Sequence, residues 1–449
     1  MNWEKLRQKV LDRFYPSRQE LEELETLYSD ISTFIQSEYG LETFFAGSAG
    51  RETCVAGDKD IDIFVLFPED TERSKLEDLG LEIGENVFES FDGEFEVEYA
   101  EHPYTKGEIQ GHEVEVVPCI DTSPQDIRSA VDRSPHHAKW VDENLSERQK
   151  KDVVVLKSFL KSQGLYGSSL KNRGFSGYLC EVLIAYAGSF EDLVHEASSW
   201  RKDKLIDIED HHDHLPQHLE EKFSDSSLKV VDPVDGERNV ASVLTSENYA
   251  KFVYSCWQFS QNPGMNFFTE KDSDLDKFKL KQEMDDRGEL IVIELDKIDE
   301  PDDIVYPQMR KAIGRLEDIL EQRDFRLYSK GFHVGSKIKV FFETSSSERN
   351  IKIKQGPKPF HSQGHVSEFT SKYDNTFIEN ERICAKIERE YTHPKDLLHD
   401  FIDQSESGLK EDGIPGNVAE KLVDASFVKP MNGDEEWLKF LYKRLRLEQ

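Results

Sequence analysis

The segment DIDIFVLF, residues 60–67, limits what this chain can fold into more than any other, because acidic and apolar residues alternate at its start. Successive side chains of a β-strand point to opposite faces of its sheet, so Asp60 and Asp62 project from one face. Ile61 and the apolar residues at alternate positions after it project from the other face into a core, and Pro68 closes the strand. The sequence therefore predicts a strand with two carboxylates about 7 Å apart on one side.

A loop of small residues, AGSAGRET, precedes this strand by about ten residues. Gly47 lets the backbone approach a phosphate closely, Ser48 offers a hydroxyl and backbone N–H groups, and Arg51 can bind a triphosphate with its guanidinium fork. Carboxylates spaced like Asp60 and Asp62 suit two divalent cations, which can stabilise both oxygens of an in-line displacement at phosphorus. Asp-x-Asp alone would be chance in a chain with 90 Asp and Glu, so the loop is what favours a metal-assisted phosphate site.

A third carboxylate is expected on a neighbouring strand. The segment HEVEVVPCI, residues 112–120, places Glu113 and Glu115 on one face and valines on the other. The pattern alone does not choose between the two glutamates. The chain offers no convincing Cys/His or Ser/His nucleophile pair, so a covalent enzyme intermediate is not expected.

The length of 449 residues is too great for one ordinary core and predicts about two to four domains. The net charge of −33 leaves open a disordered acidic protein, but recurring apolar residues and 11% aromatic residues favour a folded one. A folded chain this acidic has a strongly hydrated surface whose self-repulsion weakens as salt screens it. The composition therefore predicts a salt-loving host.

The cysteines predict a reducing cytoplasm. They are five in number and scattered, without close pairs, so neither a disulfide framework nor a zinc site is expected. The N-terminal segment MNWEKLRQKVLDRFYP is charged throughout and has no apolar signal region. No apolar run approaches the roughly 18 residues of a membrane span. We expect a cytoplasmic protein with no membrane partner.

The apolar periodicity divides the chain into units. A helix over 17–39, a strand LETFF and the strands 60–67, 95–102 and 112–120 predict a small α/β head, with Gly107 and Gly111 turning the chain between the last two. Helices over 146–163 and 177–190 predict a separate helical unit. The strands ELIVIEL and KIKVFFET flank a helical segment and predict an α+β unit, and the chain ends in helices.

Several segments resemble a known family. GSAGRET followed by GDKDID is similar to the signature of the DNA polymerase β-like nucleotidyltransferase superfamily. EVEVVPC, SAVDRSPHHAKW, LKSFLKSQGLYG, RGFSGYLCEVLI and VDPVDGERNVA resemble the archaeal-type, class I CCA-adding enzymes, in order over roughly residues 1–260 and more weakly beyond. The resemblance implies an α+β multidomain protein with a catalytic polymerase β-like head (1–145), a helical neck that binds nucleotide (146–262), an α+β body (263–322 and 381–449) and a tRNA-binding tail (323–380).

The resemblance also implies an activity: addition of C, C and A to the 3′ end of tRNA from CTP and ATP, with Mg²⁺ and release of pyrophosphate. Asp60 and Asp62 match metal ligands, and Glu115 aligns with a third carboxylate that is typically Asp in the family. Glu is one methylene longer than Asp and could still ligate a metal or orient the attacking 3′-hydroxyl, and Glu115→Ala should abolish turnover if the role persists. A homodimer is left open. The expected nucleotide-binding residues are Ser48, Arg51, Ser134 (often Thr in the family), His137, Lys157, Tyr166 and Arg238.

Each of the later positions also has a plain structural interpretation. Lys157 lies on a helix with an apolar opposite face, so an outward lysine is expected in any case; Tyr166 fits a core, and Arg238 fits a surface ion pair. Segments 170–175, 330–340 and 349–359 are locally basic, and the last two suggest a tail surface for tRNA, with solvated strand faces as the alternative. In high salt counterion release contributes little, so shape, 2′-hydroxyl contacts and stacking should carry the binding.

Three rival functions remain at this point. A poly(A) polymerase or another transferase of the superfamily shares the Asp-x-Asp loop, although the neck motifs disfavour it. A non-catalytic RNA-binding protein would not need Ser48, Arg51, Asp60 and Asp62 intact. An acidic interaction protein leaves both the loop and the paired aspartates unexplained.

Overall fold

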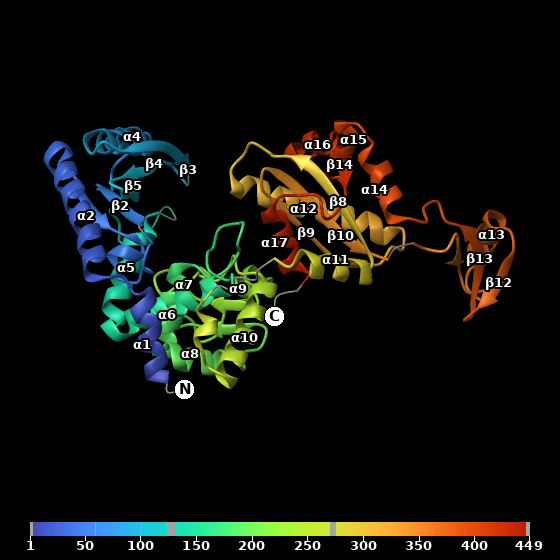
Figure 1. Cartoon of the computed structure of the whole chain (residues 1–449), viewed down its shortest axis with the longest axis horizontal. Coiled ribbons are helices and arrows are strands. Elements are labelled where there is room, and N and C mark those ends of the chain that lie inside the picture. The colour runs from blue at the N-terminus through green and yellow to red at the C-terminus, as the bar shows by residue number, and fades with distance from the viewer. Residues whose placement is uncertain are drawn as a thin grey trace. The chain divides into compact units, whose positions relative to one another are not determined.

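The structure is a computed structural model that describes residues 3–58, 60–99, 101–123, 127, 129, 131–269, 275–345 and 347–445 (Figure 1). The chain divides into two compact units, Met1–Lys271 and Asp272–Gln449. All five cysteines are free and buried. Across these described ranges, no helix combines the length and the apolar character that crossing a membrane requires.

The first unit contains a five-stranded head sheet of order β1-β2-β5-β4-β3. The central pair β2 and β5 is parallel, and the other neighbouring strands are antiparallel. The head elements are α2 (Arg18–Tyr39), β1 (Glu42–Phe45), α3 (Gly47–Gly50), β2 (Asp60–Phe67), α4 (Arg73–Ser90), β3 (Glu94–Tyr99), β4 (Pro103–Ile109) and β5 (His112–Ile120).

The head core lies between the sheet and the helices α2 and α4, which pack against it (Figure 1). Helix α2 begins at a capping box formed by Ser17 and Glu20 and ends at Gly40, whose φ of 67° only glycine adopts without strain. The apolar side chains of β2 that alternate with the aspartates enter this core and are fully buried. The aspartates consequently lie on the face of the sheet that α2 and α4 do not cover.

Strand β4 corrects one expectation. We expected the segment around Gly107 to turn the chain, but Gly107 lies within β4, and the turn comes at Gln110 and Gly111. A Cβ atom at Gly107 would lie 1.9 Å from the backbone oxygen of Glu94 on β3. Gly107 is therefore a close-approach glycine that lets two strands pair, which the local sequence does not distinguish from a turn.

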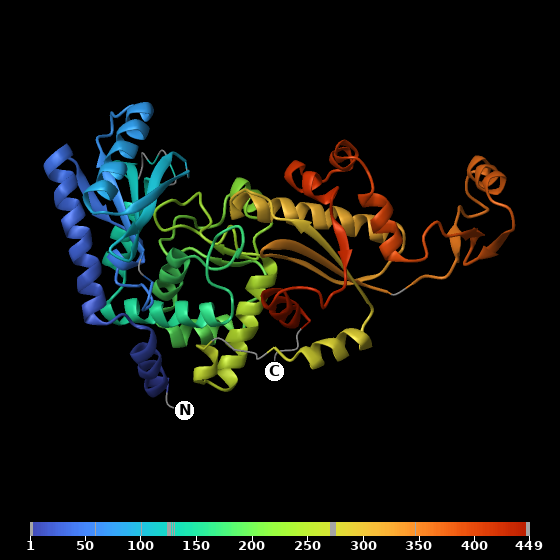
Figure 2. The same ribbon diagram turned by 45° about the horizontal axis from the view of Figure 1, so that its top comes forward.

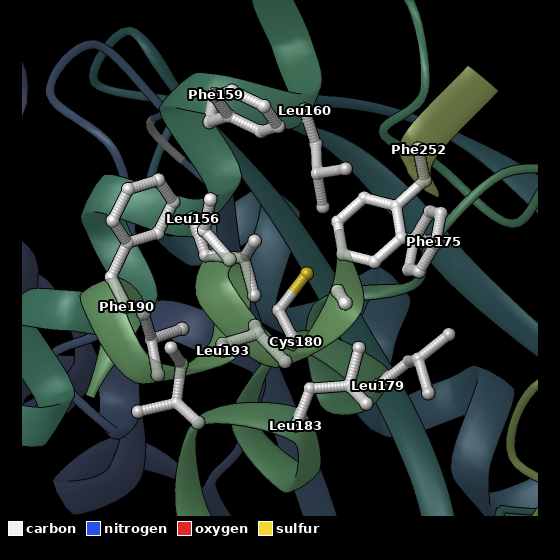
Figure 3. Close-up of a cluster of buried hydrophobic side chains, with 14 of the residues drawn as sticks. Leu156, Phe159, Leu160, Phe175, Leu179, Cys180, Leu183, Phe190, Leu193 and Phe252 are labelled. Atoms are coloured by element: carbon white, nitrogen blue, oxygen red, sulfur yellow. The ribbon is translucent and has the colours of Figure 1, made fainter. Parts of the chain in front are cut away.

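The rest of the first unit is built on a helical core (Figure 3). Helix α7 contributes Leu179, Cys180 and Leu183 to a buried apolar cluster that includes Phe159 and Phe252. The elements are α1 (Trp3–Phe14), α5 (Arg133–Asn144), α6 (Glu147–Ser162), α7 (Gly177–Ala187), α8 (Phe190–Ala197), β6 (Lys204–Ile206), α9 (Gln217–Lys222), β7 (Leu228–Val230), α10 (Ser246–Gln261) and the 3-10 helix η1 (Met265–Phe267). Helix α1, at the start of the expected head, packs in this helical core through Leu6 and Val10.

The second unit holds a four-stranded antiparallel sheet of order β14-β8-β10-β9. Figure 2 shows α12 lying over this sheet, and together they enclose the main core of the unit. The elements are α11 (Lys277–Asp286), β8 (Glu289–Asp296), α12 (Asp302–Gln322), β9 (Leu327–Val334), β10 (Lys337–Thr344), α14 (Pro394–Ile402), α15 (Glu406–Glu411), α16 (Gly416–Leu422), β14 (Ser426–Val428) and α17 (Glu435–Arg444).

The remaining elements are β11 (Ile351–Gln355), α13 (Gln363–Lys372), β12 (Thr376–Glu379) and β13 (Arg382–Glu388), and the strands form a sheet of order β11-β13-β12. This arrangement differs from the expected tail at 323–380. Strand β10 pairs along its whole length with β8, so β9 and β10 belong to the sheet of the body. Strand β13, expected in the body, is the centre of the small sheet.

Candidate active site

Four carboxylates share one face of the head sheet. On the parallel strands β2 and β5, Asp60 lies opposite Glu113 and Asp62 opposite Glu115. Lys106, on the neighbouring strand β4, lies opposite Glu115, and its Nζ is 2.7 Å from Glu113 Oε1 and 2.9 Å from Glu115 Oε1. The cluster therefore holds one lysine against four acidic groups, a balance that favours an additional cation.

Burial, together with the crowding of like charges, raises the pKa of both aspartates. Burial, followed by the charges of Glu115 and Asp60, raises the pKa of Asp62 to about 7. Burial and then the charge of Glu113 raise the pKa of Asp60. A cation placed between these side chains would relieve the repulsion and restore the charged form of Asp62.

The donor set suits a hard divalent ion, because Asp60, Asp62, Glu113 and Glu115, which β2 and β5 place on this face, all offer carboxylate oxygens. In the described part of the chain no three acidic, histidine or cysteine side chains are already gathered into a preformed metal site, and Glu115 instead accepts a hydrogen bond from Lys106. Asp60, Asp62 and Glu115 are the residues that would hold such ions, with Glu115 turning away from the lysine.

Gly47 places the loop directly against Asp62. Its φ is +66°, and a Cβ atom there would lie 1.8 Å from Asp62 Oδ2. The backbone N–H of Ala46 donates to the backbone oxygen of Asp62 at 2.9 Å, which fixes the loop to the strand. Ser48 lies half-buried in the single turn α3, and its backbone oxygen accepts from the Thr53 N–H at 2.9 Å. The glycine–serine loop is thus held beside the carboxylates, as the sequence predicts.

Arg51 pairs with a buried glutamate that sequence reasoning missed, and Lys157 bonds to Thr53, which shares that glutamate. Arg51 Nε donates to Glu181 Oε1 on α7 at 2.9 Å, and Thr53 Oγ1 donates to the same oxygen at 2.5 Å. Lys157 Nζ donates to the backbone oxygen of Thr53 at 2.8 Å. Glu181 is fully buried, and although burial opposes it, the charges of Arg51 and Lys157 hold its pKa below the usual value.

Lys157 does not point outward. Its side chain is fully buried, so the plain interpretation of an outward lysine on α6 is wrong. Burial lowers the pKa of its ammonium group. Tyr166 lies close by, because a Cβ atom at Gly177 would meet its hydroxyl at 3.3 Å and Lys157 Nζ at 3.5 Å. Burial strongly raises the pKa of the Tyr166 phenol.

A second buried carboxylate joins His137 and Arg238. Asp232 Oδ2 lies 3.0 Å from His137 Nε2 and accepts from Arg238 at 2.6 Å. Tyr178 on α7 donates its hydroxyl to Asp232 Oδ1 at 3.2 Å and stacks on the His137 ring, with 3.8 Å between ring centroids. Two of the expected nucleotide-binding residues, His137 and Arg238, are thus brought together through residues that the sequence analysis did not select.

Ser134 lies three residues before His137 on α5, so the two side chains share one side of that helix. Its neighbour Arg133 donates to Asp235 at 3.1 Å, which ties the start of α5 to the loop that carries Arg238. Helix α7 then connects both halves of the site, because Tyr178 and Glu181 are also three residues apart.

The missed residues differ in the signal they offered. Glu181 is the single charged residue in the apolar helix GYLCEVLIAYA, and a lone buried carboxylate requires a cationic partner. That pattern was available in the sequence. Asp232 lies in a loop with other acidic residues, where nothing local marks it as buried. Lys106 lies in a segment that we expected to be a turn.

The parallel β2–β5 pair with its acidic face, and a glycine–serine loop packed on it, define a nucleotidyltransferase. Residues 9–137 match the family model described as a nucleotidyltransferase domain. Residues 151–269 match the second domain of tRNA nucleotidyltransferase, and residues 287–422 match the C-terminal domain of CCA-adding enzyme. The chain belongs to the family of CCA-adding enzymes.

Relatives support this over nearly the whole length. The chain is 36% identical over 443 residues to the CCA-adding enzyme of Methanocaldococcus jannaschii, covering 96% of this chain and 94% of that protein. It is 35% identical over 407 residues to that of Archaeoglobus fulgidus, covering 89% and 90%. A solved structure of the Cid1 poly(U) polymerase is similar with a TM-score of 0.49 and 12% identity, covering 60% of this chain and 98% of that one. The resemblance to archaeal-type CCA-adding enzymes is confirmed.

The basic segments expected to bind tRNA are largely paired within the protein. Lys330 pairs with Glu317, Lys339 lies 2.6 Å from Glu294, and Lys337 lies 3.4 Å from an Asp296 oxygen. In the small sheet, Lys352 is 2.8 Å from Asp324 and Lys358 is 2.9 Å from Glu381. These lysines carry less net positive charge to a phosphate backbone than the sequence alone suggests.

Proposed function

We propose that the first unit transfers C, C and A in turn from CTP and ATP to the 3′ end of tRNA, with Mg²⁺ held by Asp60, Asp62 and Glu115. The observation that carries this proposal is the register of β2 and β5, which puts Asp62 beside Glu115 on an open face of the head sheet. Family membership supplies the reaction class, and this acidic face supplies the place where it occurs.

In this proposal, each residue of the site has a separate role in binding the nucleotide. Gly47 brings backbone N–H groups of the loop to the triphosphate, and Ser48 adds its hydroxyl. Arg51 and Lys157 supply positive charge to the phosphates, with Glu181 and Thr53 fixing where both cations lie. Tyr166 borders the same cations. The 3′-hydroxyl of tRNA attacks the α-phosphorus of the nucleotide, and pyrophosphate leaves.

Divalent ions, when bound, supply a lower pKa for the attacking hydroxyl and neutralise charge on the leaving phosphates. The carboxylates position these charges, and no side chain forms a covalent intermediate. We propose Mg²⁺ as the ion, because carboxylate and phosphate oxygens are the ligands it prefers.

Nucleotide choice falls to His137, Arg238 and Ser134. A guanidinium can hydrogen-bond the Watson–Crick edge of cytosine or adenine, so that protein replaces a template. Arg238 is only partly buried, with 37% of its side chain exposed, and can reach a bound base. Its ion pair with Asp232 also matches the plain structural interpretation, so base reading by Arg238 is part of the proposal.

We further propose that tRNA binds the second unit, with the tail limited to β11, β12, β13 and α13. Arg349, just before β11, and Lys354, within it, are exposed, and neither forms an ion pair with another described residue. The buried, free cysteines fit a reducing cytoplasm as the place of the reaction. Whether the chain forms a homodimer is tested by light scattering of the purified chain in high salt.

The deciding experiment incubates the full-length chain in high salt with Mg²⁺, labelled CTP or ATP, and tRNA ending before, within or after CCA. Ordered addition of C, C and A, with no extension of complete tRNA, supports the proposal. Repeated addition of A would establish a poly(A) polymerase-like transferase instead. Tight tRNA binding without any incorporation would establish a non-catalytic RNA-binding protein.

Two variants test whether the reaction occurs at the acidic face of the head sheet. Asp60→Asn should abolish incorporation while leaving tRNA binding intact. Asp70→Asn is the matched control, since Asp70 is an exposed residue in the turn after β2. Equal activity of the two variants would overturn the assignment of the acidic face.

A further inference from the structure

The loop of residues 231–239, which carries Arg238, is organised around one carboxylate. Asp232 is fully buried and accepts four hydrogen bonds, from His137, Tyr178, Arg238 and the backbone N–H of Val234 at 3.0 Å. Although burial opposes it, the hydrogen bond and charge of His137, the Val234 amide and the Arg238 charge lower the pKa of Asp232 to about 2. The carboxylate is therefore charged at every pH at which the protein works.

The path of the loop backbone does not depend on that carboxylate alone. The backbone N–H of Asp232 donates to the backbone oxygen of Arg238 at 2.9 Å and closes the loop. His211 Nε2 donates to the backbone oxygen of Pro233 at 3.0 Å, and His212 Nε2 donates to that of Gly236 at 2.8 Å. These contacts hold most of the loop, so the carboxylate, apart from its bond to the Val234 N–H, acts on side chains.

The side chains that it fixes, Arg238 and His137, are both among the expected nucleotide-binding residues. Arg238 uses one terminal nitrogen on Asp232 Oδ2, which leaves other N–H donors of its guanidinium for a base edge. His137 is held on the same oxygen and is clamped against the Tyr178 ring. Because both donors share one oxygen, their relative position is set by a single atom.

We propose that Asp232 is a positioning residue that sets nucleotide choice, by holding Arg238 and His137 in the one arrangement that accepts cytosine or adenine. This inference rests on the proposed function. A guanidinium free to swing would still supply positive charge, but it would present its donors in several orientations. Discrimination against uracil and guanine would fall while the chemistry at the carboxylates of β2 continued.

The test is Asp232→Asn, which keeps the shape of the side chain and removes its charge. We expect the ratio of kcat/KM for CTP over UTP, and for ATP over GTP, to fall at least about 10-fold, mainly through KM for the correct nucleotide. Glu237→Gln is the control, because Glu237 lies in the same loop, is exposed, and its carboxylate lies 3.7 Å from His218 outside this cluster. The control should keep both ratios within about twofold.

A purely structural role would lower kcat/KM for all four nucleotides alike, and a folded Asp232→Asn variant with unchanged ratios would also overturn the inference. Should Asp232→Asn not fold, Tyr178→Phe decides: it removes one hydrogen bond to Asp232 and keeps the stacked ring. It should lower the ratios about two- to fivefold, and unchanged ratios reject the inference. The wild-type chain separates the two proposals, because failure to add C, C and A would reject the proposed function itself.

Discussion

Asp62 on β2 lies directly opposite Glu115 on β5, so that two acidic side chains from parallel strands occupy the same position on one face of the head sheet. Hydrogen bonding between the strands fixes this proximity whether or not a cation is present. The folded protein therefore bears an electrostatic cost at the place where a divalent ion would be held.

Asp62→Asn should stabilise the metal-free protein while abolishing activity. The raised pKa of Asp62, about 7, means that the folded protein retains a proton that the unfolded chain releases, so the free energy of unfolding falls as pH rises from about 4 to about 7. At pH 8 the variant should be more stable by about 1–3 kcal/mol. The gap should narrow steadily toward pH 5. Urea unfolding with EDTA at constant high salt measures it, and a gap that does not change with pH would contradict the explanation.

The variants Glu115→Ala and Glu113→Ala should distinguish the catalytic roles of the two glutamates of β5, because they should lower activity by different amounts. Glu115 faces Asp62, the more buried aspartate, so its removal should lower kcat at least about 100-fold. Glu113 faces the exposed Asp60, and half of its own side chain is exposed, so its removal should cost less than about fivefold. Both variants lose a partner of Lys106, which makes them a matched pair. Single-turnover incorporation of labelled CTP measures kcat, and equal losses would refute the assignment of Glu115.

Gly47→Ala should inactivate the protein, because the added methyl group would displace the Asp62 carboxylate. Its Cβ atom would meet Asp62 Oδ2 at 1.8 Å, and the displaced carboxylate should lower kcat/KM at least about 100-fold. Gly40→Ala is the matched control, with nearly the same φ of +67° and nothing within 4 Å of the added atom. The control should lose about 1 kcal/mol of stability and no activity. A comparable loss of activity in both variants would mean that backbone strain, and not the contact with Asp62, is responsible.

Where the signal is local, the sequence predicts the fold closely. Strand β2 has the expected bounds, and α2 and α6 begin after Ser17 and Ser146, the residues that cap them. Where pairing between segments that are distant in sequence determines the structure, the prediction from sequence is wrong. The segment with Gly107 is a strand because β3 lies against it, and β9 and β10 belong to the body because β10 pairs with β8. No local pattern distinguishes these cases.

The same division holds for the site. Alternation along β2 was enough to predict the acidic face, and the loop before it was enough to predict what packs on that face. The buried partners were not predicted, because Glu181 lies 130 residues from Arg51 in sequence. Burial also changed the interpretation of Lys157, whose ammonium group ends inside the protein and not at its surface.

Glu181→Ala should unfold the first unit more easily than any exposed substitution. Removing this carboxylate leaves the Arg51 and Lys157 charges buried without their partner, which costs about 3–5 kcal/mol. Glu181→Gln, which keeps the shape and can still accept from Arg51, should cost less. The exposed Glu191 on α8 is the control, and Glu191→Ala should change stability by less than about 0.5 kcal/mol. Chemical unfolding at pH 8 in high salt gives all three values, and a Glu181→Ala variant as stable as the control would show that the cluster is not a buried ion pair.

The affinity for tRNA should depend only weakly on salt. The lysines at 330, 337, 339, 352 and 358 already pair with carboxylates of the chain, so few cations remain to displace counterions from the RNA. With about three phosphates neutralised, a plot of log K against log salt should have a slope no steeper than about −3. Fluorescence anisotropy with tRNA lacking its CCA end, between moderate and molar KCl, measures the slope. Arg349→Gln and Lys354→Gln should each make it shallower by about 1. A slope steeper than about −6, in a protein whose circular dichroism is unchanged over the range, would require a phosphate-binding surface that these ion pairs do not leave available.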